Sequence, residues 1–343
     1  MTLTTEAALG SLAICASTSA VDSSLEARLA DAQALLKDDL SWVERALRES
    51  AAQGPQPGSN AARHLVELGG KRVRPMALLL ASACFGPVPA ASRHMAVCVE
   101  LIHSATLLHD DVIDEGTERR GRDAARIVWG NAVSVLSGDL LLTHALVTAQ
   151  HHAPSLMPAL LGMLRKLVEG EIVQLRGRSE LDVSEAVYAS ILRDKTAALF
   201  RFSTSAGAEL AGAPERLQGL LADFGECIGM AFQLVDDLLD YAGDSTGKTM
   251  FADLRQGKLT LPLVLAVQDD PKLLEQLSQI RSGDQSLVAS LRQSVIASGA
   301  CERVGARALG YTSKATEYLD LLPASAARSL LRSVAQQLAD RSR

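Results

Sequence analysis

Two short acidic motifs, each set in an apolar run, constrain this 343-residue chain more than any other feature. The first, Leu107–Asp114 (LLHDDVID), places Asp110 and Asp114 four residues apart. The second (FQLVDDLLD) repeats that spacing with Asp236 and Asp240. Residues four apart lie on one face of a helix, so a helix would present both carboxylates of each motif together. The motifs therefore predict helices with two acidic edges.

These acidic edges require a positive partner. Like charges four apart destabilise a helix by about 0.2–0.5 kcal/mol, and burying them unpaired costs more. Oxygen ligands without His or Cys at ligand spacing suit Mg²⁺, which keeps several waters and is commonly shared with substrate phosphates. The sequence therefore predicts a Mg²⁺-dependent site for a phosphorylated substrate.

The composition favours helices packed on helices. Hydrophobic residues make up 48% of the chain but aromatic residues only 3%, whereas β-rich folds draw on aromatic and β-branched residues. Helical periodicity predicts helices over residues 24–52, 59–68, 76–85, 91–113, 131–148, 155–175, 183–210 and 216–241, and another from about 260. His151 and His152 are predicted to lie in a solvated loop, and strand-like alternation is absent. We therefore predict an all-α fold.

Residues 1–22 are predicted to be a disordered N-terminal extension, and residues 23–343 a single all-α domain. The N-terminus carries Glu6 and has no Lys or Arg before Arg28, unlike a signal peptide. No apolar run approaches about 20 residues, which predicts no transmembrane segment. A net charge of -6 without a basic stripe argues against nucleic-acid binding. Five cysteines without paired spacing indicate free thiols in a reducing cytoplasm.

A basic segment, Gly69–Pro75 (GGKRVRP), precedes the first acidic motif. Two glycines permit a tight turn, and the proline suits the first turn of the next helix. By itself this segment fits either a phosphate site or a solvated basic turn. Arg119 and Arg120 follow the first acidic motif, and guanidinium groups suit phosphate oxygens. His103 lies two turns before the first acidic motif. By itself it fits either a contact to an anion or a structural residue.

Six segments, taken in order, resemble the motif series of the trans-isoprenyl diphosphate synthases. They are Gly69–Pro75, Leu107–Asp114, Arg119–Gly121, Lys195–Thr196, Phe232–Asp240 and Gly257–Pro262. The resemblance covers residues 60–270, approximately. It implies an all-α bundle around a deep central cavity, with the two acidic motifs on facing helices at its mouth, and a homodimer.

The resemblance also implies a reaction between isopentenyl diphosphate and an allylic diphosphate. In this family, three Mg²⁺ ions bridge the aspartates to the allylic diphosphate and withdraw its pyrophosphate. The double bond of isopentenyl diphosphate then attacks the allylic cation, and a proton is lost. The physical chemistry agrees, because a primary allylic C–O bond ionises only if the leaving charge is neutralised.

By this resemblance, each motif residue has an expected role. The metal ligands are Asp110, Asp114, Asp236 and Asp240. The allylic diphosphate, or the surroundings of the cation, would meet Arg119, Lys195, Thr196, Gln233, Lys248 and Lys258. Isopentenyl diphosphate would be held by Lys71, Arg74, His103 and Arg120.

Product length is expected to depend on residues preceding the first acidic motif. In the family, a bulky aromatic residue four or five positions before the first aspartate limits the chain. Here these positions are the small residues Ala105 and Thr106. The predicted 91–113 helix would be roughly 35 Å long, enough to line a tunnel. We therefore predict a long-chain, octaprenyl-like product for a quinone side chain, whereas an aromatic residue from another helix would give geranylgeranyl or farnesyl diphosphate.

Three other interpretations are considered. A class I terpene cyclase shares the ionisation step but carries a mixed Asn/Ser/Glu second motif, where this chain has aspartates. A non-catalytic partner subunit would have lost an acidic motif or the basic segment. A helical protein with solvated aspartates would explain either acidic cluster but not the whole ordered series.

Overall fold

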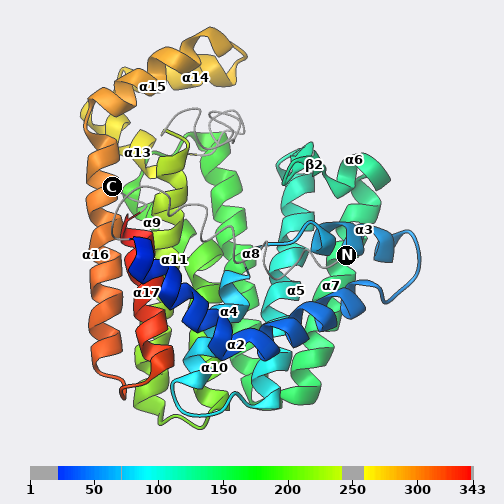
Figure 1. Cartoon of the computed structure of the whole chain (residues 1–343). Coiled ribbons are helices and arrows are strands. Elements are labelled where there is room, and N and C mark those ends of the chain that lie inside the picture. Colours follow the sequence, from blue (N-terminus) through cyan, green and yellow to red (C-terminus); the bar gives the residue numbers. More distant parts are fainter. Residues whose placement is uncertain (1–21, 71, 242–258, 341–343) are drawn as a thin grey trace. The chain divides into compact units, whose positions relative to one another are not determined.

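The structure, a computed structural model, describes residues 22–70, 72–241 and 259–340 (Figure 1). Nearly all elements in these ranges are helices, which confirms the predicted all-α class. The longer ones are α2 (Asp22–Ala51), α3 (Gly58–Glu67), α4 (Val73–Ala83), α5 (Ala90–Ile113), α7 (Asn131–His152), α8 (Met157–Glu180), α10 (Ala198–Leu210), α11 (Glu215–Leu239), α16 (Ala300–Asp320) and α17 (Ala326–Asp340). Shorter helices are α6 (Ala125–Trp129), α9 (Glu185–Ile191), α13 (Leu261–Asp269), α14 (Leu273–Arg281) and α15 (Val288–Ala297).

The chain divides into two compact units, and each is described by itself. The first comprises Met1–Ala159, Ser203–Leu221 and Leu322–Ser333, and the second comprises Leu160–Phe202, Ala222–Leu321 and Val334–Arg343. The expectation of one domain over residues 23–343 stays a prediction. The predicted extension at residues 1–22 falls, except for its last residue, outside the described part of the chain.

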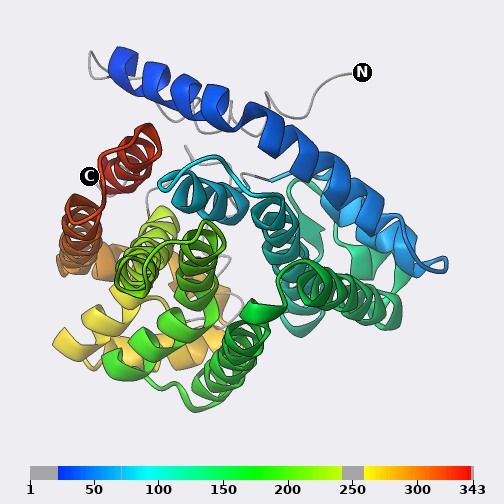
Figure 2. The same cartoon turned by 90° about the horizontal axis from the view of Figure 1, so that it is seen from below.

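The first unit is built around α5. This helix packs against α4, α7 and α2, and its buried side chains include Met95, Cys98 and Leu101. In Figure 2, α2 runs across α4 and α5 on one side of this unit. Gly207 allows a close approach between α10 and α4, since a Cβ there would lie 2.2 Å from the carbonyl oxygen of Leu78. The same unit therefore positions the basic segment and the first acidic motif.

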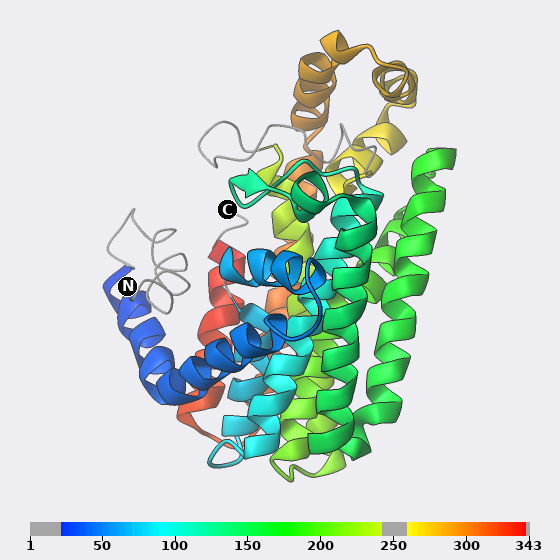
Figure 3. The same ribbon diagram turned by 90° about the vertical axis from the view of Figure 1, so that its right-hand side faces the viewer.

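A small hairpin that the sequence patterns did not predict follows the first acidic motif (Figure 3). Strands β1 (Glu118–Arg119) and β2 (Arg122–Asp123) pair antiparallel. The two-residue loop between them has positive φ at Arg120 (54°) and Gly121 (75°), as a tight type I′ hairpin turn requires. Left-handed backbone is unfavourable for a residue with a Cβ, so Arg120 is held in a strained position.

The second unit contains a π-helical segment, η3 (Leu192–Ala197), between α9 and α10. Two glycines allow neighbouring helices to approach it. A Cβ at Gly229 of α11 would lie 2.5 Å from the Cα of Ala197, and one at Gly170 of α8 would lie 3.0 Å from the backbone nitrogen of Lys195. Single π turns are frequent at functional sites, and this one carries Lys195 and Thr196.

The prediction for His151 and His152 was wrong. Both residues belong to the last turn of α7, although their side chains are exposed. The ring of His152 stacks on that of His94 from α5, with centroids 3.4 Å apart, and His151 packs edge-on against His152. The helix continues past residue 148, and its last turn contacts α5 through this ring stacking, a contact between segments distant in the sequence that helical periodicity does not report.

Among the described residues, α7 is the one helix that is long and apolar enough to cross a membrane by length and composition. The core helix of a water-soluble protein passes the same test, so this finding is weak evidence for a membrane span.

Candidate functional site

The middle aspartate of the first acidic motif is bound by the protein itself. Asp111 is 1% exposed, and its Oδ1 accepts hydrogen bonds from Nε (3.0 Å) and Nη2 of Arg119. Its carbonyl oxygen accepts from the backbone N–H of Gly116. Asp111 therefore joins the end of α5 to the hairpin, and Arg119 is held by it.

The middle aspartate of the second motif has the same character. Asp237 is 3% exposed and accepts from the Tyr188 hydroxyl (2.5 Å), the Gln233 amide (3.1 Å) and the backbone N–H of Leu261 (3.2 Å). These donors come from α9, α11 and the start of α13. Asp237 therefore ties three helices of the second unit together.

The outer aspartates are the residues predicted to bind metal. Asp110, Asp114 and Asp236 are half-buried, and Asp240 is buried. Within residues 22–70, 72–241 and 259–340, no three His, Cys, Asp or Glu side chains converge to hold a metal ion. The carboxylate chemistry suits Mg²⁺, and the metal-binding roles of these four residues stay predictions.

Two arginines and a histidine, Arg74, Arg120 and His103, lie close together at the basic segment in the first unit. Arg74 and His103 are half-buried, and Arg120 is exposed. Both arginines interact electrostatically with the buried Glu100, and His103 interacts with both arginines. Burial lowers the pKa of Arg74 to about 10 although Glu100 acts in the opposite direction, so this arginine stays charged near neutral pH. Burial and then the charges of Arg74 and Arg120 lower the pKa of His103 well below its usual value, which keeps its imidazole neutral.

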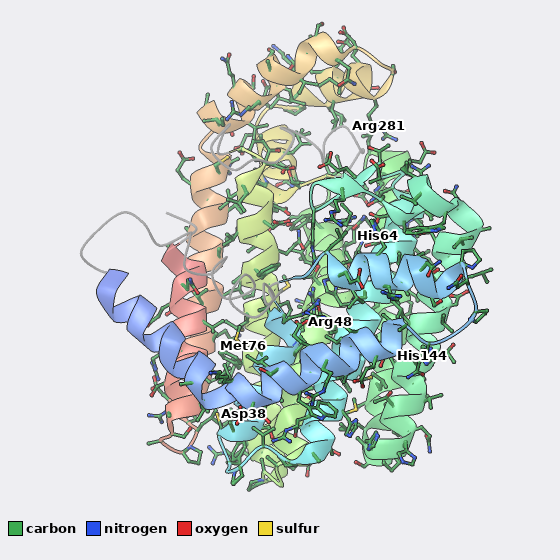
Figure 4. All side chains as sticks on the ribbon, turned by 45° about the vertical axis from the view of Figure 1, so that its right-hand side comes forward. Asp38, Arg48, His64, Met76, His144 and Arg281 are labelled. Atoms are coloured by element: carbon green, nitrogen blue, oxygen red, sulfur yellow. The ribbon has the colours of Figure 1, made fainter. Side chains whose placement is uncertain are left out.

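The hairpin that carries Arg120 is held from α3. His64 Nε2 lies 2.9 Å from the carbonyl oxygen of Asp123, and the His64 ring packs edge-on against Trp129 with centroids 5.2 Å apart. Figure 4 labels His64 on α3. The Arg120 guanidinium lies against Gly70, because a Cβ on that glycine would be 3.0 Å from both terminal nitrogens. The structure thus brings Arg120 to the basic segment, 50 residues earlier in the chain.

In the second unit, the π-helical segment connects to the second acidic motif. The Thr196 hydroxyl donates to Gln233 Oε1 (3.2 Å), and the amide of Gln233 donates to Asp237 (3.1 Å). Lys195 forms an ion pair with Glu171 of α8. Two predicted residues, Thr196 and Gln233, therefore belong to one polar network with the motif, and Lys195 is paired with Glu171.

For the other predicted site residues, the structure gives little or no information about their roles. Lys71, Lys248 and Lys258 lie outside the described residues. Ala105 is buried, and the half-buried Thr106 donates its hydroxyl to the carbonyl oxygen of His103 (2.8 Å).

Sequence reasoning gave no role to Glu100 or Glu171, which form ion pairs with Arg72 and Lys195. For Glu100, the available signal was a charged residue in an otherwise apolar helical run.

Comparison with known proteins identifies the family of this chain. Residues 56–296 match the family model described as polyprenyl synthetase. Component 2 of the heptaprenyl diphosphate synthase of Geobacillus stearothermophilus is 37% identical over 310 residues, covering 89% of this chain and 97% of that protein.

Two crystal structures are also similar. That of a decaprenyl diphosphate synthase from Rhodobacter capsulatus has a TM-score of 0.86 and 36% identity, covering 91% of this chain and 99% of that one. A polyprenyl synthase from Caulobacter crescentus CB15, complexed with calcium and isoprenyl diphosphate, has a TM-score of 0.83 and 36% identity, covering 91% and 97%. The chain belongs to the polyprenyl synthetase family and is a prenyltransferase of the trans-prenyl diphosphate synthase type.

Proposed function

We propose that this enzyme condenses isopentenyl diphosphate with an allylic diphosphate and repeats the step to make a long-chain, octaprenyl-like product. The observation that carries the proposal is the cluster of Arg74, Arg120 and neutral His103. Arg120 borders Gly70, both arginines interact with the charge of Glu100, and His103 interacts with both arginines. Three guanidinium groups, counting Arg72, share this place with the carboxylates Glu44 and Glu100. The excess of positive charge suits a diphosphate.

In this proposal, the cluster binds the diphosphate of isopentenyl diphosphate. Arg74 and Arg120 offer planar donors that match phosphate oxygens. Neutral His103 adds a hydrogen bond without a charge. Lys71, outside the described residues, is proposed as a fourth contact.

The allylic diphosphate is proposed to meet the outer aspartates through Mg²⁺. Bound Mg²⁺, about three ions per site, would neutralise the charge that develops on the leaving pyrophosphate. The four-residue spacing of each pair and the preference of Mg²⁺ for carboxylate oxygens support Asp110, Asp114, Asp236 and Asp240 as the metal ligands. Lys195, Thr196 and Gln233, with Arg119, Lys248 and Lys258, are proposed to contact the allylic diphosphate or stabilise the cation.

Product length is proposed to depend on Ala105 and Thr106. The purified protein, given Mg²⁺, isopentenyl diphosphate and a farnesyl diphosphate primer, should make a ladder of products ending near eight isoprene units, sized by chromatography. The variant Ala105→Phe should stop several units earlier because its ring would narrow the path of the growing chain. Ala105→Ser, which adds one atom, is the control. Wild-type products that end at three or four units, or an unchanged ladder from a stable Ala105→Phe, would contradict long-chain specificity through this position.

We also propose a cytoplasmic homodimer that uses the exposed face of α7. Leu136 and Val147 are 64% and 63% exposed and lie on one side of that helix, three turns apart. Exposed apolar side chains that gather on one face mark interaction surfaces.

We expect Leu136→Glu to convert the dimer to a monomer in light scattering. Leu321→Glu, at a residue that is 54% exposed at the end of α16, should leave the dimer intact. A Leu136→Glu protein that stays dimeric would exclude this face, and a wild-type protein recovered in the membrane fraction would contradict the cytoplasmic location.

A further inference from the structure

Arg72 is the arginine of the basic segment to which no role in binding substrate has been given. Its Nε lies 2.6 Å from Oε1 of Glu44, and its Nη1 lies 2.7 Å from Oε1 of Glu100. Its Nη2 donates to Glu44 Oε2 (3.4 Å) and to the carbonyl oxygen of Val66 (3.3 Å). Four of the five N–H groups of a guanidinium are thus directed at protein acceptors. Arg72 is therefore bound to the protein and not available to a diphosphate.

The backbone of Arg72 explains why it needs such anchors. Its φ of 47° and ψ of 35° are left-handed, which is unfavourable for a residue with a Cβ. It also directly precedes α4, whose first turn contains Arg74. Strained conformations persist only when the surroundings determine them. The ion pairs with Glu44 and Glu100 stabilise this conformation of Arg72. They therefore fix where α4 begins and where Arg74, in its first turn, is placed.

The same anchors act on Arg120. A Cβ on Gly70 would lie 3.1 Å from Nη1 of Arg72 and 3.0 Å from the Arg120 guanidinium, so both cations border this glycine. Burial by itself would lower the pKa of Arg72, but the charges and hydrogen bonds of Glu100 and Glu44 outweigh burial and raise it. Glu100 also offsets the lowered pKa of Arg74 and of Arg120. The two carboxylates thus supply the negative charge that lets these guanidinium groups lie together.

We propose that Arg72 is a positioning residue, anchored by Glu44 of α2 and Glu100 of α5, that holds the start of α4 and the side of Gly70 in the geometry in which Arg74 and Arg120 bind the diphosphate of isopentenyl diphosphate. The inference rests on the proposed function. The inference also assigns α2 a role in the site, because Glu44 belongs to α2 and contacts Arg72, which lies 28 residues later in the chain.

Glu44→Gln tests the inference, because it removes one anchoring charge at nearly constant size. Loss of a charge-assisted hydrogen bond should raise the KM for isopentenyl diphosphate about tenfold. The KM for the allylic diphosphate and kcat should change less than about twofold. The described contacts of Glu44 are with Arg72, and not with the residues proposed to bind the allylic diphosphate. Arg72→Lys should behave similarly because an ammonium cannot reproduce the two-pronged contact. The control is Glu67→Gln, which removes an exposed carboxylate in the same unit.

An unchanged KM for isopentenyl diphosphate in both variants would overturn the inference. So would an equal rise in the KM for both substrates together with a lower Tm, because that result indicates a purely structural role. A wild-type enzyme that elongates no primer would instead overturn the proposed function, and this inference with it.

Discussion

Asp110→Asn should reduce the elongation rate about a thousandfold, equivalent to about 4 kcal/mol of transition-state stabilisation. The amide cannot neutralise Mg²⁺, and the leaving pyrophosphate would lose part of its charge compensation. Since separate residues, Arg74, His103 and Arg120, are proposed to bind isopentenyl diphosphate, the KM for that substrate should remain nearly constant. Steady-state kinetics with labelled isopentenyl diphosphate, together with Tm, would measure both effects.

The matched control for this variant is Glu115→Gln. Glu115 is an exposed carboxylate just past the same motif, and its loss should leave the rate within about twofold of the wild type. If Asp110→Asn kept more than about a tenth of the wild-type rate with saturating Mg²⁺, the metal-binding role of Asp110 would be wrong.

Asp237→Ala should lower the free energy of unfolding by about 3 kcal/mol or more, because it leaves three donors without their acceptor in a buried place. For a chain of 343 residues, a loss of this size corresponds to a Tm lower by roughly 4 °C. The cause is the loss of the link among α9, α11 and α13. Thermal unfolding followed by circular dichroism measures it.

Asp236→Ala is the comparison within the same motif. The Asp236 side chain is half-buried, so its removal should lower activity strongly and Tm by less than about 2 °C. Equal Tm values for the two variants would show that the middle and outer aspartates do not divide their roles as described here.

Local patterns in the sequence predicted most of the helices. The periodic apolar residues of 91–113 match α5 (Ala90–Ile113), and those of 24–52 match α2 (Asp22–Ala51). The apolar face of a helix produces a spacing of three or four residues that can be read within one continuous segment. The hairpin was not predicted, since its strands have two residues each and depend on a turn with Arg120 at positive φ. Alternation cannot be seen in so short a segment.

The residues of the candidate site that lie in recognisable motifs could be predicted from the sequence. The aspartate spacing and the resemblance gave the residues, but not the difference between Asp110 and Asp111, which depends on an arginine from the following hairpin. Glu44 was missed for the same reason, because its partner Arg72 lies 28 residues away. Spacing reports neighbours on one helix, whereas these roles arise from contacts between helices.

Each turn of elongation is proposed to join one isopentenyl diphosphate and release one pyrophosphate. The most direct measurement mixes the purified enzyme, Mg²⁺, farnesyl diphosphate and labelled isopentenyl diphosphate, and counts pyrophosphate released against label incorporated. We predict a ratio of about one to one and no release when isopentenyl diphosphate is omitted. Release of pyrophosphate from the allylic substrate alone would identify a cyclase, and no release under any condition would identify a subunit that requires a partner.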